Sequence, residues 1–489
     1  MRRIIIYFIT LMITCPACDN FLEQEPGTQT STDEIFSSYT GYKMALNGCY
    51  YSLEELLTGV RNAVYADALG GNIAFTPSKT NYGISVPTFI ENIYSFADLA
   101  DDSDMDLVYD DFYGIINAAN IILDRIPGLT DATDDQVSQL KAEVLCIRAI
   151  CHFYLARYYA QNYSYTADAS HPGIICNTKV QQAGKDYPAR KTVKETYDII
   201  ITDLQTALNS FTPENILAGP VYSYFNNNSC KALLARVALY AQNYQLALDY
   251  ASDVIENSGI ALLGKDDYIQ EWEKPNTPVS EIIFELSAKK DNQGSVKTTN
   301  TLAAHFGVLP DNDEFKDYCA SPDLLNLFDE NDIRGKGMYT EASIETIVEG
   351  ETETAFPSYF FTNKFQDNPG NPVLRMSEMY LIRAEAYARL NETESALTVL
   401  NTLRAERGAL PATNTDNILD EIFTERRKEL CFEGHLFFDI ARFHKNAERY
   451  SGCIATTCNL NYPSYYFILP IPKSNTDLNS NLEQNEGYN

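Results

Sequence analysis

The sequence predicts a mainly α protein built as a scaffold of paired helices. Three observations predict this fold class. Helical hydrophobic periods come in pairs separated by only a few residues, and two of these pairs share the same landmark residues. Long segments without a helical period lie between the pairs, so the scaffold is interrupted by insertions.

The clearest pair covers residues 229–242 and 245–257. Apolar residues of the second segment share one helix face: Ala247, Leu248, Ala251, Val254 and Ile255. Asn-Ser-Gly at 257–259 then ends the helix. Because so few residues separate the two segments, we expect them to fold back as a helical hairpin.

The pattern recurs over residues 377–408. Aligned with the first pair, "YLIRAEAYARLNETESAL" and "LLARVALYAQNYQLAL" share an arginine four residues before a tyrosine, and a closing Ala-Leu. The arginine and tyrosine are Arg236 and Tyr240 in one pair, Arg383 and Tyr387 in the other. Such pairs resemble tetratricopeptide repeats, in which small residues stand where the two helices touch.

Two further pairs are expected, 146–159 with 193–211, and 37–57 followed by 109–126. The long insertions between the pairs cover residues 62–106, 163–190 and 264–372. They are rich in Pro, Gly, Asn, Thr and aromatic residues and show no sustained helical period. Long loops on a rigid scaffold are where binding usually occurs, so we expect the insertions to carry the ligand site.

The first residues predict an export signal and a lipid anchor. Two arginines precede the mostly apolar residues 4–13, a run too short to cross a bilayer. Ala17 then precedes Cys18, as in the lipobox that bacterial lipoprotein signal peptidase cuts. We expect residues 1–17 to be a lipoprotein signal peptide and Cys18 to be lipidated. The alternative is ordinary secretory cleavage near Ala17 with Cys18 unmodified.

The composition excludes some partners. The chain has 67 acidic and 37 basic residues, a formal net charge of −30, which repels nucleic acid and anionic lipid headgroups. Tyrosine is abundant (33 residues, against one tryptophan). Its large, rigid ring with a polar tip suits wet binding surfaces, although many of these tyrosines are expected to pack between helices.

The cysteines predict one disulfide at most. Cys453 and Cys458 flank a short polar loop and are the one pair that we expect to bond in an exported protein. Cysteines inside helical patterns are expected to be small buried hydrophobes: Cys146, Cys151, Cys230 and Cys431. No cysteine has a histidine at zinc-ligand spacing.

We predict no cofactor. Asp102, Asp104 and Asp106 begin like an EF-hand loop, but Leu107 stands at the glycine position and Tyr113 at the final glutamate position. A looser structural calcium site and a solvated loop both stay open for this segment. The five histidines form no catalytic or metal signature, and no phosphate-binding glycine loop is present.

The C-terminal third carries long specific motifs. "EIFTERRKELCFEGHLFFDIARF" and "FILPIPKSNTDLNSNLEQNEGY" closely resemble the signatures of the SusD/RagB family of nutrient-binding outer-membrane lipoproteins. "LRMSEMYLIRAEAY", "KTVKETYDIIITDLQTAL" and the lipobox extend the resemblance over the whole chain. His435, Phe443 and Glu486 depart from the residues common in the family, at positions that are structural.

The resemblance implies a SusD-like, surface-exposed lipoprotein of a Gram-negative outer membrane. It implies a single domain over residues 18–489, with helical pairs to about 263, an insertion over about 264–372 and a signature region over about 373–489. It also implies a SusC-like TonB-dependent transporter as partner, an oligosaccharide or polysaccharide as ligand, and no enzymatic activity. Peptide or another nutrient is the alternative ligand.

The signature contains acids that resemble a catalytic pair. Glu425, Arg426, Glu429 and Glu433 fall at helical i+3 and i+4 spacing, so we expect acids and arginine to pair along one face. Glycosidase carboxylates must instead face an open cleft, whereas these alternate with apolar residues such as Phe432. A purely scaffolding protein is disfavoured in turn, because it would not need long aromatic insertions.

A glycan site needs aromatic faces for sugar C–H groups, and polar groups for hydroxyls. The family shares no site motif, so we choose candidates by location. They come from the first and the last insertion: Asn72, Asn81, Tyr82, Tyr94, Tyr268, Trp272, Phe306, Asp311 and Tyr318. We expect two or three of them to contact ligand. The run 359–361 is left out because it is expected to be a buried strand.

Overall fold

We describe a computed structural model of the chain. It describes residues 31–182, 184–274, 277–287, 300–307, 316–347, 354–365 and 370–488. Cys18 and Asp311 therefore lie outside the described residues. The described part is mainly helical with five short two-stranded antiparallel ladders, so the predicted fold class is confirmed.

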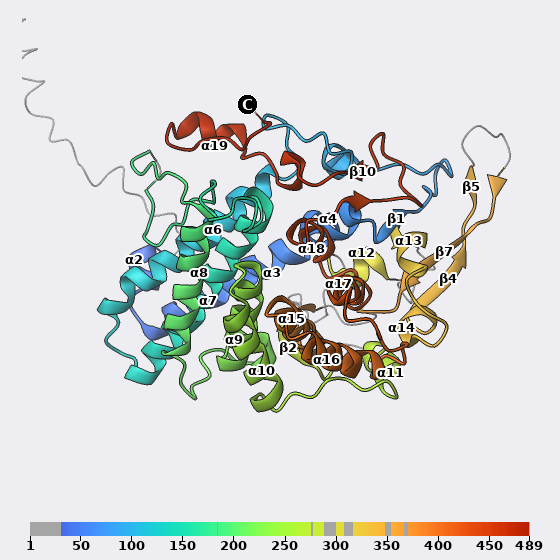
Figure 1. Ribbon diagram of the computed structural model, residues 1–489. Helices are drawn as coiled ribbons and strands as arrows, with labels where there is room; N and C mark the ends of the chain where they lie inside the picture. Colours follow the sequence, from blue (N-terminus) through green and yellow to red (C-terminus); the bar gives the residue numbers. More distant parts are fainter. Residues whose placement is uncertain are drawn as a thin grey trace, which may run out of the picture.

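All four expected helical pairs are present. The first two are α9 (Asn227–Tyr240) with α10 (Tyr244–Asn257), and α15 (Met376–Arg389) with α16 (Thr393–Ala405). The other two are α7 (Asp134–Tyr159) with α8 (Val193–Leu208), and α3 (Tyr39–Thr58) with α6 (Asp106–Arg125). Figure 1 shows α7, α8, α9 and α10 stacked side by side, and contacts between α10 and α15 continue the array into the C-terminal third.

Local signals define the ends of these helices. Thr133, Thr192 and Asn226 each accept a hydrogen bond from a backbone N–H of the first turn, in three complete capping boxes that begin α7, α8 and α9. The turns inside two pairs are built alike, since Gln242 and Asn391 both take a left-handed backbone, with φ of 54° and 66°. The equivalent turns confirm that these two pairs are structural repeats.

The remaining elements cover the scaffold. The shorter helices are α2 (Thr32–Ile35), α4 (Val60–Gly70), α5 (Glu91–Tyr94), α11 (Tyr268–Trp272), α12 (Leu302–Phe306), α13 (Pro322–Leu325), α14 (Ile333–Lys336), α17 (Ile418–Glu429), α18 (Leu436–Arg442) and α19 (Lys473–Leu478). The strands pair as β1 (Ile73–Phe75) with β3 (Tyr318–Ala320), β2 (Ile282–Leu286) with β8 (Asn371–Arg375), β4 (Tyr339–Ser343) with β7 (Ser358–Thr362), β5 (Thr346–Ile347) with β6 (Thr354–Ala355), and β9 (Ala447–Glu448) with β10 (Asn459–Leu460).

Two expectations about the insertions need correction. The first insertion begins inside the 11-residue helix α4, which holds nine buried residues and no amphipathic stripe, so it shows little helical period in sequence. The run 359–361 does form a strand, β7, but only Phe361 is fully buried. Tyr359 and Phe360, at the exposed end of β7, are half-buried.

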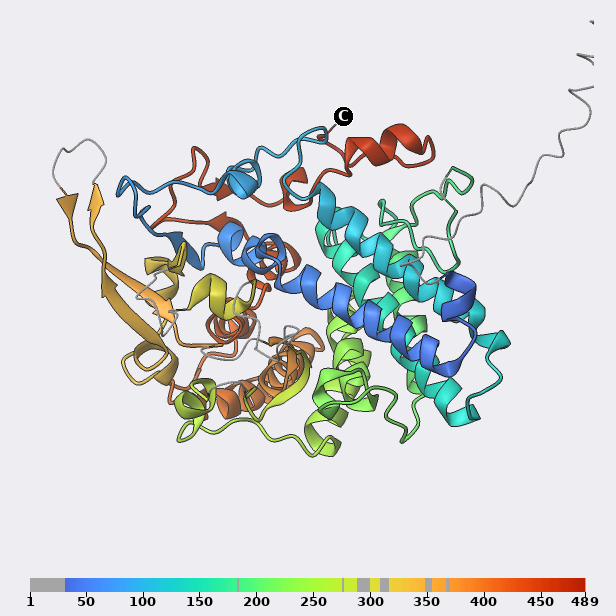
Figure 2. The ribbon, with the colours of Figure 1, turned by 180° about the vertical axis from the view of Figure 1, so that it is seen from behind.

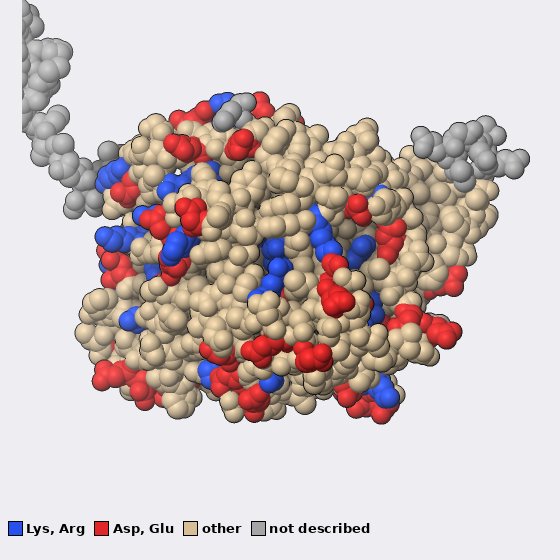
Figure 3. Space-filling view, in the orientation of Figure 1, with Lys and Arg blue, Asp and Glu red and all other residues tan. Residues whose placement is uncertain are grey.

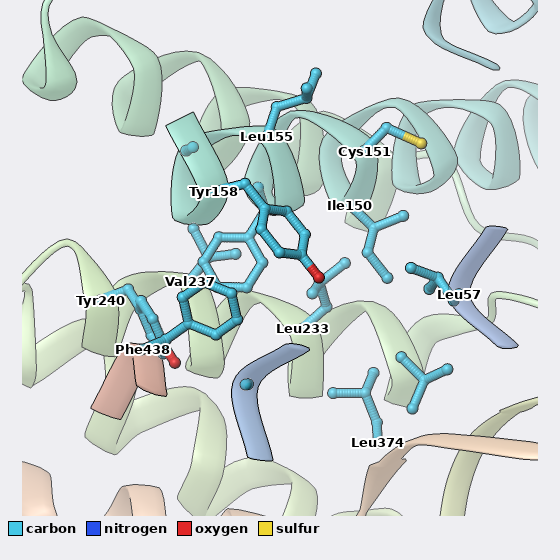
Figure 4. Packing of buried hydrophobic residues seen from close by; sticks show 14 of the residues in the cluster. Leu57, Ile150, Cys151, Leu155, Tyr158, Leu233, Val237, Tyr240, Leu374 and Phe438 are labelled. Atoms are coloured by element: carbon cyan, nitrogen blue, oxygen red, sulfur yellow. The ribbon is translucent and has the colours of Figure 1, made fainter. Parts of the chain in front are cut away.

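One large hydrophobic core joins the helical pairs to the C-terminal third. Figure 4 shows Tyr158 of α7, Val237 and Tyr240 of α9, and Phe438 of α18 packed together. Seen from behind in Figure 2, α3 crosses the molecule, and its Leu57 belongs to the same core. The helices of the N-terminal pairs, one face of α15 and the signature helix α18 therefore share one interior, whereas α16 and α17 pack with the other face of α15 in a second, smaller cluster.

A buried charge network ties the signature helix α17 to three distant segments. Glu429 accepts hydrogen bonds from Arg334 of the last insertion (2.8 Å), Arg375 at the end of β8 (2.6 Å) and Arg407 after α16 (3.0 Å). All four side chains are at most 3% exposed. The expected pairing along one helix face is thus largely wrong, because most partners come from other elements and only Lys428 pairs with Glu425 along α17.

Neutralising Glu429 tests how much the fold depends on this network. We expect Glu429→Gln to lower the free energy of unfolding by about 3–5 kcal/mol, because it leaves buried guanidinium groups without their shared carboxylate. Urea unfolding followed by circular dichroism measures the change.

The matched control is Glu421→Gln on the same helix. Glu421 pairs with Arg404 but is 36% exposed, so its loss is expected to cost no more than about 1 kcal/mol. Equal unfolding midpoints for the two variants would show that the network does not stabilise the fold.

Candidate functional site

The fold brings the first and last insertions together. β1 of the first insertion pairs with β3 of the last, in the register Ile73 with Ala320 and Phe75 with Tyr318. The side chain of Ser321 donates a hydrogen bond to the carbonyl of Gly71 (2.7 Å), which extends the junction beyond the strands. The two insertions from which the ligand candidates were chosen are therefore neighbours, through strands that the sequence did not predict.

Asp67, near the end of α4, fastens this junction to the signature region. Its carboxylate accepts hydrogen bonds from the side chain of Asn72 (2.7 Å) and from the backbone N–H groups of Phe432 (2.9 Å) and Gly434 (3.1 Å). Burial raises the pKa of Asp67, and these donors oppose the rise. Gly71 takes φ +90° in the tight turn before β1, where a side chain would be strained.

Six of the predicted ligand residues are buried. They are no more than 3% exposed and offer no surface to a solute in this structure: Asn72, Tyr94, Tyr268, Trp272, Phe306 and Tyr318. Their expected role in an open aromatic platform is therefore not met.

Trp272 and Tyr268 instead cover the charge network. The ring centroid of Tyr268 lies 4.4 Å from the guanidinium of Arg407, and that of Trp272 lies 5.9 Å from the guanidinium of Arg375. Aromatic faces shield buried cations at little desolvation cost, which explains why these rings point inward.

The other four buried candidates hold the junction together. The ring of Tyr94 packs edge-on against Phe75 (4.9 Å), and Phe306 contacts the ring of Tyr318 (6.1 Å). Asn72 accepts a hydrogen bond from Arg427 (2.9 Å) in addition to its bond to Asp67. Their contribution to a binding surface is to position the segments around it.

Asn81 and Tyr82 remain exposed. Tyr82 is 38% exposed and takes φ +58°, in a loop that begins after β1. Its carbonyl accepts a hydrogen bond from the N–H of Ile347 in β5 (2.8 Å), so this loop contacts the last insertion. The side chain of Asn81 accepts from the N–H of Gly83 (3.0 Å) and stiffens the loop. Asn81 and Tyr82 are the candidates that the structure leaves accessible to a ligand.

A cleft of about 610 Å³ opens beside the junction. Gly70 of the first insertion, Asp323 of the last insertion, and α17, α18 and β9 of the signature region line it. Aromatic rings are contributed by Phe423, His444 and Tyr450, and Tyr450 is 71% exposed. Figure 3 shows basic and acidic side chains close together over α17 and α18 on this face.

The polar groups of the cleft are held in place by contacts. Lys445 lies 5.1 Å from the ring centroid of Phe423 and pairs with Asp420 (2.6 Å). The carboxylate of Asp323 accepts the backbone N–H groups of Tyr450 (2.8 Å) and Ser451 (3.0 Å), which fixes the loop that presents the Tyr450 ring. The cleft therefore combines fixed ring faces with both signs of charge, and this combination suits a polyhydroxylated ligand with apolar C–H faces.

Sequence reasoning missed this cleft for two reasons. Phe423 and Arg427 lie inside the family signature, whose charged residues we interpreted as structural. Tyr450 follows the short strand β9 and belongs to no periodic pattern. The available signal was the neighbouring Cys453–Cys458 pair, which marks a constrained surface loop.

The predicted disulfide is confirmed. Cys453 and Cys458 are bonded, and their Cα atoms are 6.0 Å apart. Arg449 donates to the carbonyls of Thr457 (2.7 Å) and Cys458 (2.9 Å), and its guanidinium lies 4.2 Å from the ring centroid of Tyr94. The disulfide loop is thereby fixed to the first insertion, next to the cleft.

The signature acids do not form a catalytic pair. Burial raises the pKa of Glu429, but Arg407, Arg375 and Arg334 outweigh it and hold the pKa well below its usual range. Glu425 and Glu433 are likewise buried and bound to cations. General acids need a raised pKa and an open cleft, and these three acids have neither.

The acidic segment 102–106 is bonded to the protein itself. The carboxylate of Asp104 accepts backbone N–H groups of Asn92 (3.2 Å) and Ile93 (3.4 Å) at the start of α5. Asp98 accepts the hydroxyl of Ser103 (2.8 Å). In the described ranges, no group of three or more His, Cys, Asp or Glu side chains is placed to hold a metal ion.

A larger groove of about 1100 Å³ lies between α3 and α6, and α2 closes one end. Met44, Tyr51 and Leu107 line it and are 67%, 52% and 59% exposed. Contiguous exposed apolar surface of this kind marks an interaction site.

Among the helices that the structure describes, none has the length and apolar character that crossing a membrane requires.

The fold and the signature region define a class of proteins in which paired helices form a scaffold and the long insertions form one of its surfaces. Residues 20–239 match the family described as starch-binding and associating with the outer membrane, and residues 361–488 match the SusD family. The chain belongs to the SusD/RagB family, as the sequence motifs predicted.

Relatives match along the whole chain. A SusD-like protein of Formosa agariphila, P25, is 23% identical and aligns with 99% of this chain and 98% of its own. A SusD superfamily structure from Bacteroides thetaiotaomicron is 25% identical, has a TM-score of 0.78 and covers 92% of this chain and 99% of its own. A SusD-like carbohydrate-binding protein from Bacteroides vulgatus is 20% identical, with a TM-score of 0.72 and coverage of 91% and 97%.

Asp98 gives the first insertion a pH dependence that can be measured. Burial raises its pKa to about 7, and the carboxylate of Asp104 adds to the rise while Ser103 opposes it. Between about pH 4 and pH 7, Asp98 is protonated in the folded state and ionised in the unfolded chain. The contribution of Asp98 to the free energy of unfolding is therefore largest below about pH 4 and decreases until about pH 7. We expect Asp98→Asn to remove this fall, which is at most about 4 kcal/mol.

Thermal unfolding of both proteins at pH values from about 4 to 8 provides the measurement. Asp102→Asn is the control, because Asp102 is exposed and its neutralisation is expected to leave the slope unchanged. Parallel profiles for wild type and Asp98→Asn would contradict the prediction.

Proposed function

We propose that this protein is a cell-surface lipoprotein that binds an oligosaccharide or polysaccharide and delivers it to a SusC-like TonB-dependent transporter. It binds without catalysis. Membership in the SusD/RagB family supports this function, as do a family description and a structural neighbour that name starch and carbohydrate. The observation that carries the proposal is the cleft beside the junction, whose aromatic rings and charged groups match sugar chemistry.

The glycan lies in the cleft with sugar C–H faces against Tyr450 and Phe423. Asp323 and Asp420 accept hydrogen bonds from hydroxyls, and Arg427 donates to sugar oxygens. The bond that Arg427 makes to the side chain of Asn72 positions its guanidinium. The cleft volume of about 610 Å³ accommodates a few sugar units, so a longer chain would extend over the adjacent surface.

Asn81 and Tyr82 are the proposed outer contacts for such a chain. They lie on the loop that follows β1. The strand β1 also packs against the disulfide loop: a Cβ added to Gly452 in that loop would lie 2.9 Å from the Cβ of Ala74 in β1. An exposed tyrosine beside an amide supplies a stacking face and hydrogen bonds.

A peptide is the second candidate ligand. The cleft presents carboxylates (Asp323, Asp420 and Glu448) and cations (Arg427 and Lys445) together, and such a set also suits the charged ends of a peptide. The two ligands can be distinguished by substitution. Removing the aromatic rings weakens glycan binding more than removing the charged groups does, and the reverse holds for peptide binding.

The groove between α3 and α6 is the proposed transporter contact. It begins at α2, where the described chain starts, and Ser31 stands 13 positions after Cys18. A chain of that length spans at most about 45 Å, so a lipid anchor at Cys18 keeps this end of the molecule near the membrane.

Removing ring faces tests the glycan site. We expect Tyr450→Ala and Phe423→Ala each to weaken binding of the cognate polysaccharide about tenfold, because each loses a stacking surface worth about 1.4 kcal/mol. Affinity electrophoresis against a polysaccharide panel identifies the glycan, and calorimetry measures the change in Kd.

Tyr187→Ala is the matched control, since Tyr187 is 46% exposed and does not line the cleft. Tyr82→Ala is expected to weaken the binding of long glycan chains and to leave the binding of short ones unchanged. Unchanged affinity in the Tyr450 and Phe423 variants would show that the glycan binds at another site. If only peptides bound from a panel of glycans and peptides, the ligand would be a peptide and not a glycan.

Replacing the anchor residue tests the proposed localisation. We expect Cys18→Ala to abolish fatty-acid labelling of the protein and to shift it from the membrane fraction to the soluble fraction, because the acyl chains supply the anchor. Mass spectrometry of the mature N-terminus is the direct measurement. Cys49→Ala, at a buried cysteine, is the control. Equal membrane recovery of the unlabelled Cys18 variant would contradict the anchor.

A further inference from the structure

Arg157, in the last turn of α7, differs from the other buried arginines. Eight of the ten buried arginines in the described part of the chain pair with a carboxylate. Arg449 lacks a carboxylate but donates to two carbonyls. Arg157 is 6% exposed, its Nε has no hydrogen-bond partner, and no ion pair reaches its guanidinium within the described residues. An uncompensated buried cation is costly, so a missing partner is indicated.

Aromatic rings cover the faces of this guanidinium and leave its edge free. Its central carbon lies 4.2 Å from the ring centroid of Tyr154 and 4.4 Å from that of Phe438. Rings satisfy the positive charge only in part, and they accept none of the in-plane N–H groups. The donors of Arg157 therefore remain available to a ligand in the plane of the guanidinium.

A cavity of about 30 Å³ lies beside Arg157. Tyr240 of α9, Phe438 of α18 and Gln161 after α7 line it together with Arg157. Figure 4 shows Tyr240 and Phe438 next to each other at the edge of the core. The hydroxyl of Tyr240 and the amide oxygen of Gln161 are also buried and unpartnered. Three orphaned polar groups thus line one small cavity.

The surrounding carboxylates are all paired with other arginines. Arg236 is matched by Glu378, at 2.5 Å. Arg426 and Arg442 share Asp439, and Arg442 also binds Glu385. Arg389, which is 25% exposed, also reaches Glu385 (3.7 Å), so these ion pairs leave no carboxylate for Arg157.

The nearby imidazole does not change this balance. Burial, with Arg236 and Arg426 close by, lowers the pKa of His435 well below its usual range, so His435 is neutral. A water molecule would satisfy hydrogen bonds but would leave the charge of Arg157 uncompensated.

We propose that this cavity binds a small monovalent anion of about the size of chloride, held by the N–H groups of Arg157 and the hydroxyl of Tyr240. The volume admits one such ion and is too small for sulfate, phosphate or a sugar acid. The ion completes the packing of α7 against α9 and α18, and the protein is accordingly more stable in chloride than in a bulky anion.

Bromide locates the ion directly. Crystals of the wild-type protein grown or soaked in sodium bromide are expected to show an anomalous peak in the cavity, in contact with Arg157. Sodium gluconate serves as the matched salt in solution, because gluconate is too large to enter. At equal ionic strength near 0.3 M, we expect the Tm to be about 2 °C higher in chloride.

Two variants connect the effect to the cavity. Arg157→Met keeps the apolar stem and removes the charge, so the Tm difference between chloride and gluconate is expected to vanish. Tyr240→Phe removes one donor and should reduce the difference even if the first variant folds poorly. Water alone in the cavity of the bromide crystal, or a chloride effect that persists in both variants, would overturn the proposal.

Discussion

The carboxylate of Glu429 is the interaction on which the rest of the structure depends. One side chain accepts hydrogen bonds from Arg334, Arg375 and Arg407, which belong to three segments far apart in the chain. A buried ion cluster stabilises little relative to a hydrophobic one, but displacing one member leaves the others as uncompensated buried charges. It therefore specifies where the last insertion lies on α17, and Trp272 and Tyr268 shield the cations from above.

Fixing α17 also fixes the binding face. The same helix contributes Phe423 and Arg427 to the cleft, and Arg427 reaches the first insertion through Asn72. Asp67 then holds that insertion to the loop after α17, at Phe432. The irregular segments around the cleft need few contacts of their own, because each is attached to a rigid helix by buried polar bonds.

Features that leave a regular spacing or a long motif in the sequence were predicted correctly. All four helical pairs, the disulfide and the family were predicted because helical spacing, cysteine spacing and long motifs are local signals. The residues of the candidate cleft were not predicted, because an aromatic residue in an irregular segment carries no pattern that separates buried from exposed positions. Trp272 is buried against Arg375, a residue about one hundred positions away, whereas Tyr450 is exposed beside a strand of two residues.

The two proposed surfaces lie on different faces of the molecule. α17 and α18, which line the cleft, lie toward the viewer in Figure 1, while α3 and α6, which line the groove, lie toward the viewer in Figure 2. The described chain begins at the groove between α3 and α6, so the proposed anchor at Cys18 would place that groove near the membrane. The proposed ligand site and the proposed transporter contact share no lining residue, so under the proposed function the ligand and the transporter would not compete for the same side chains.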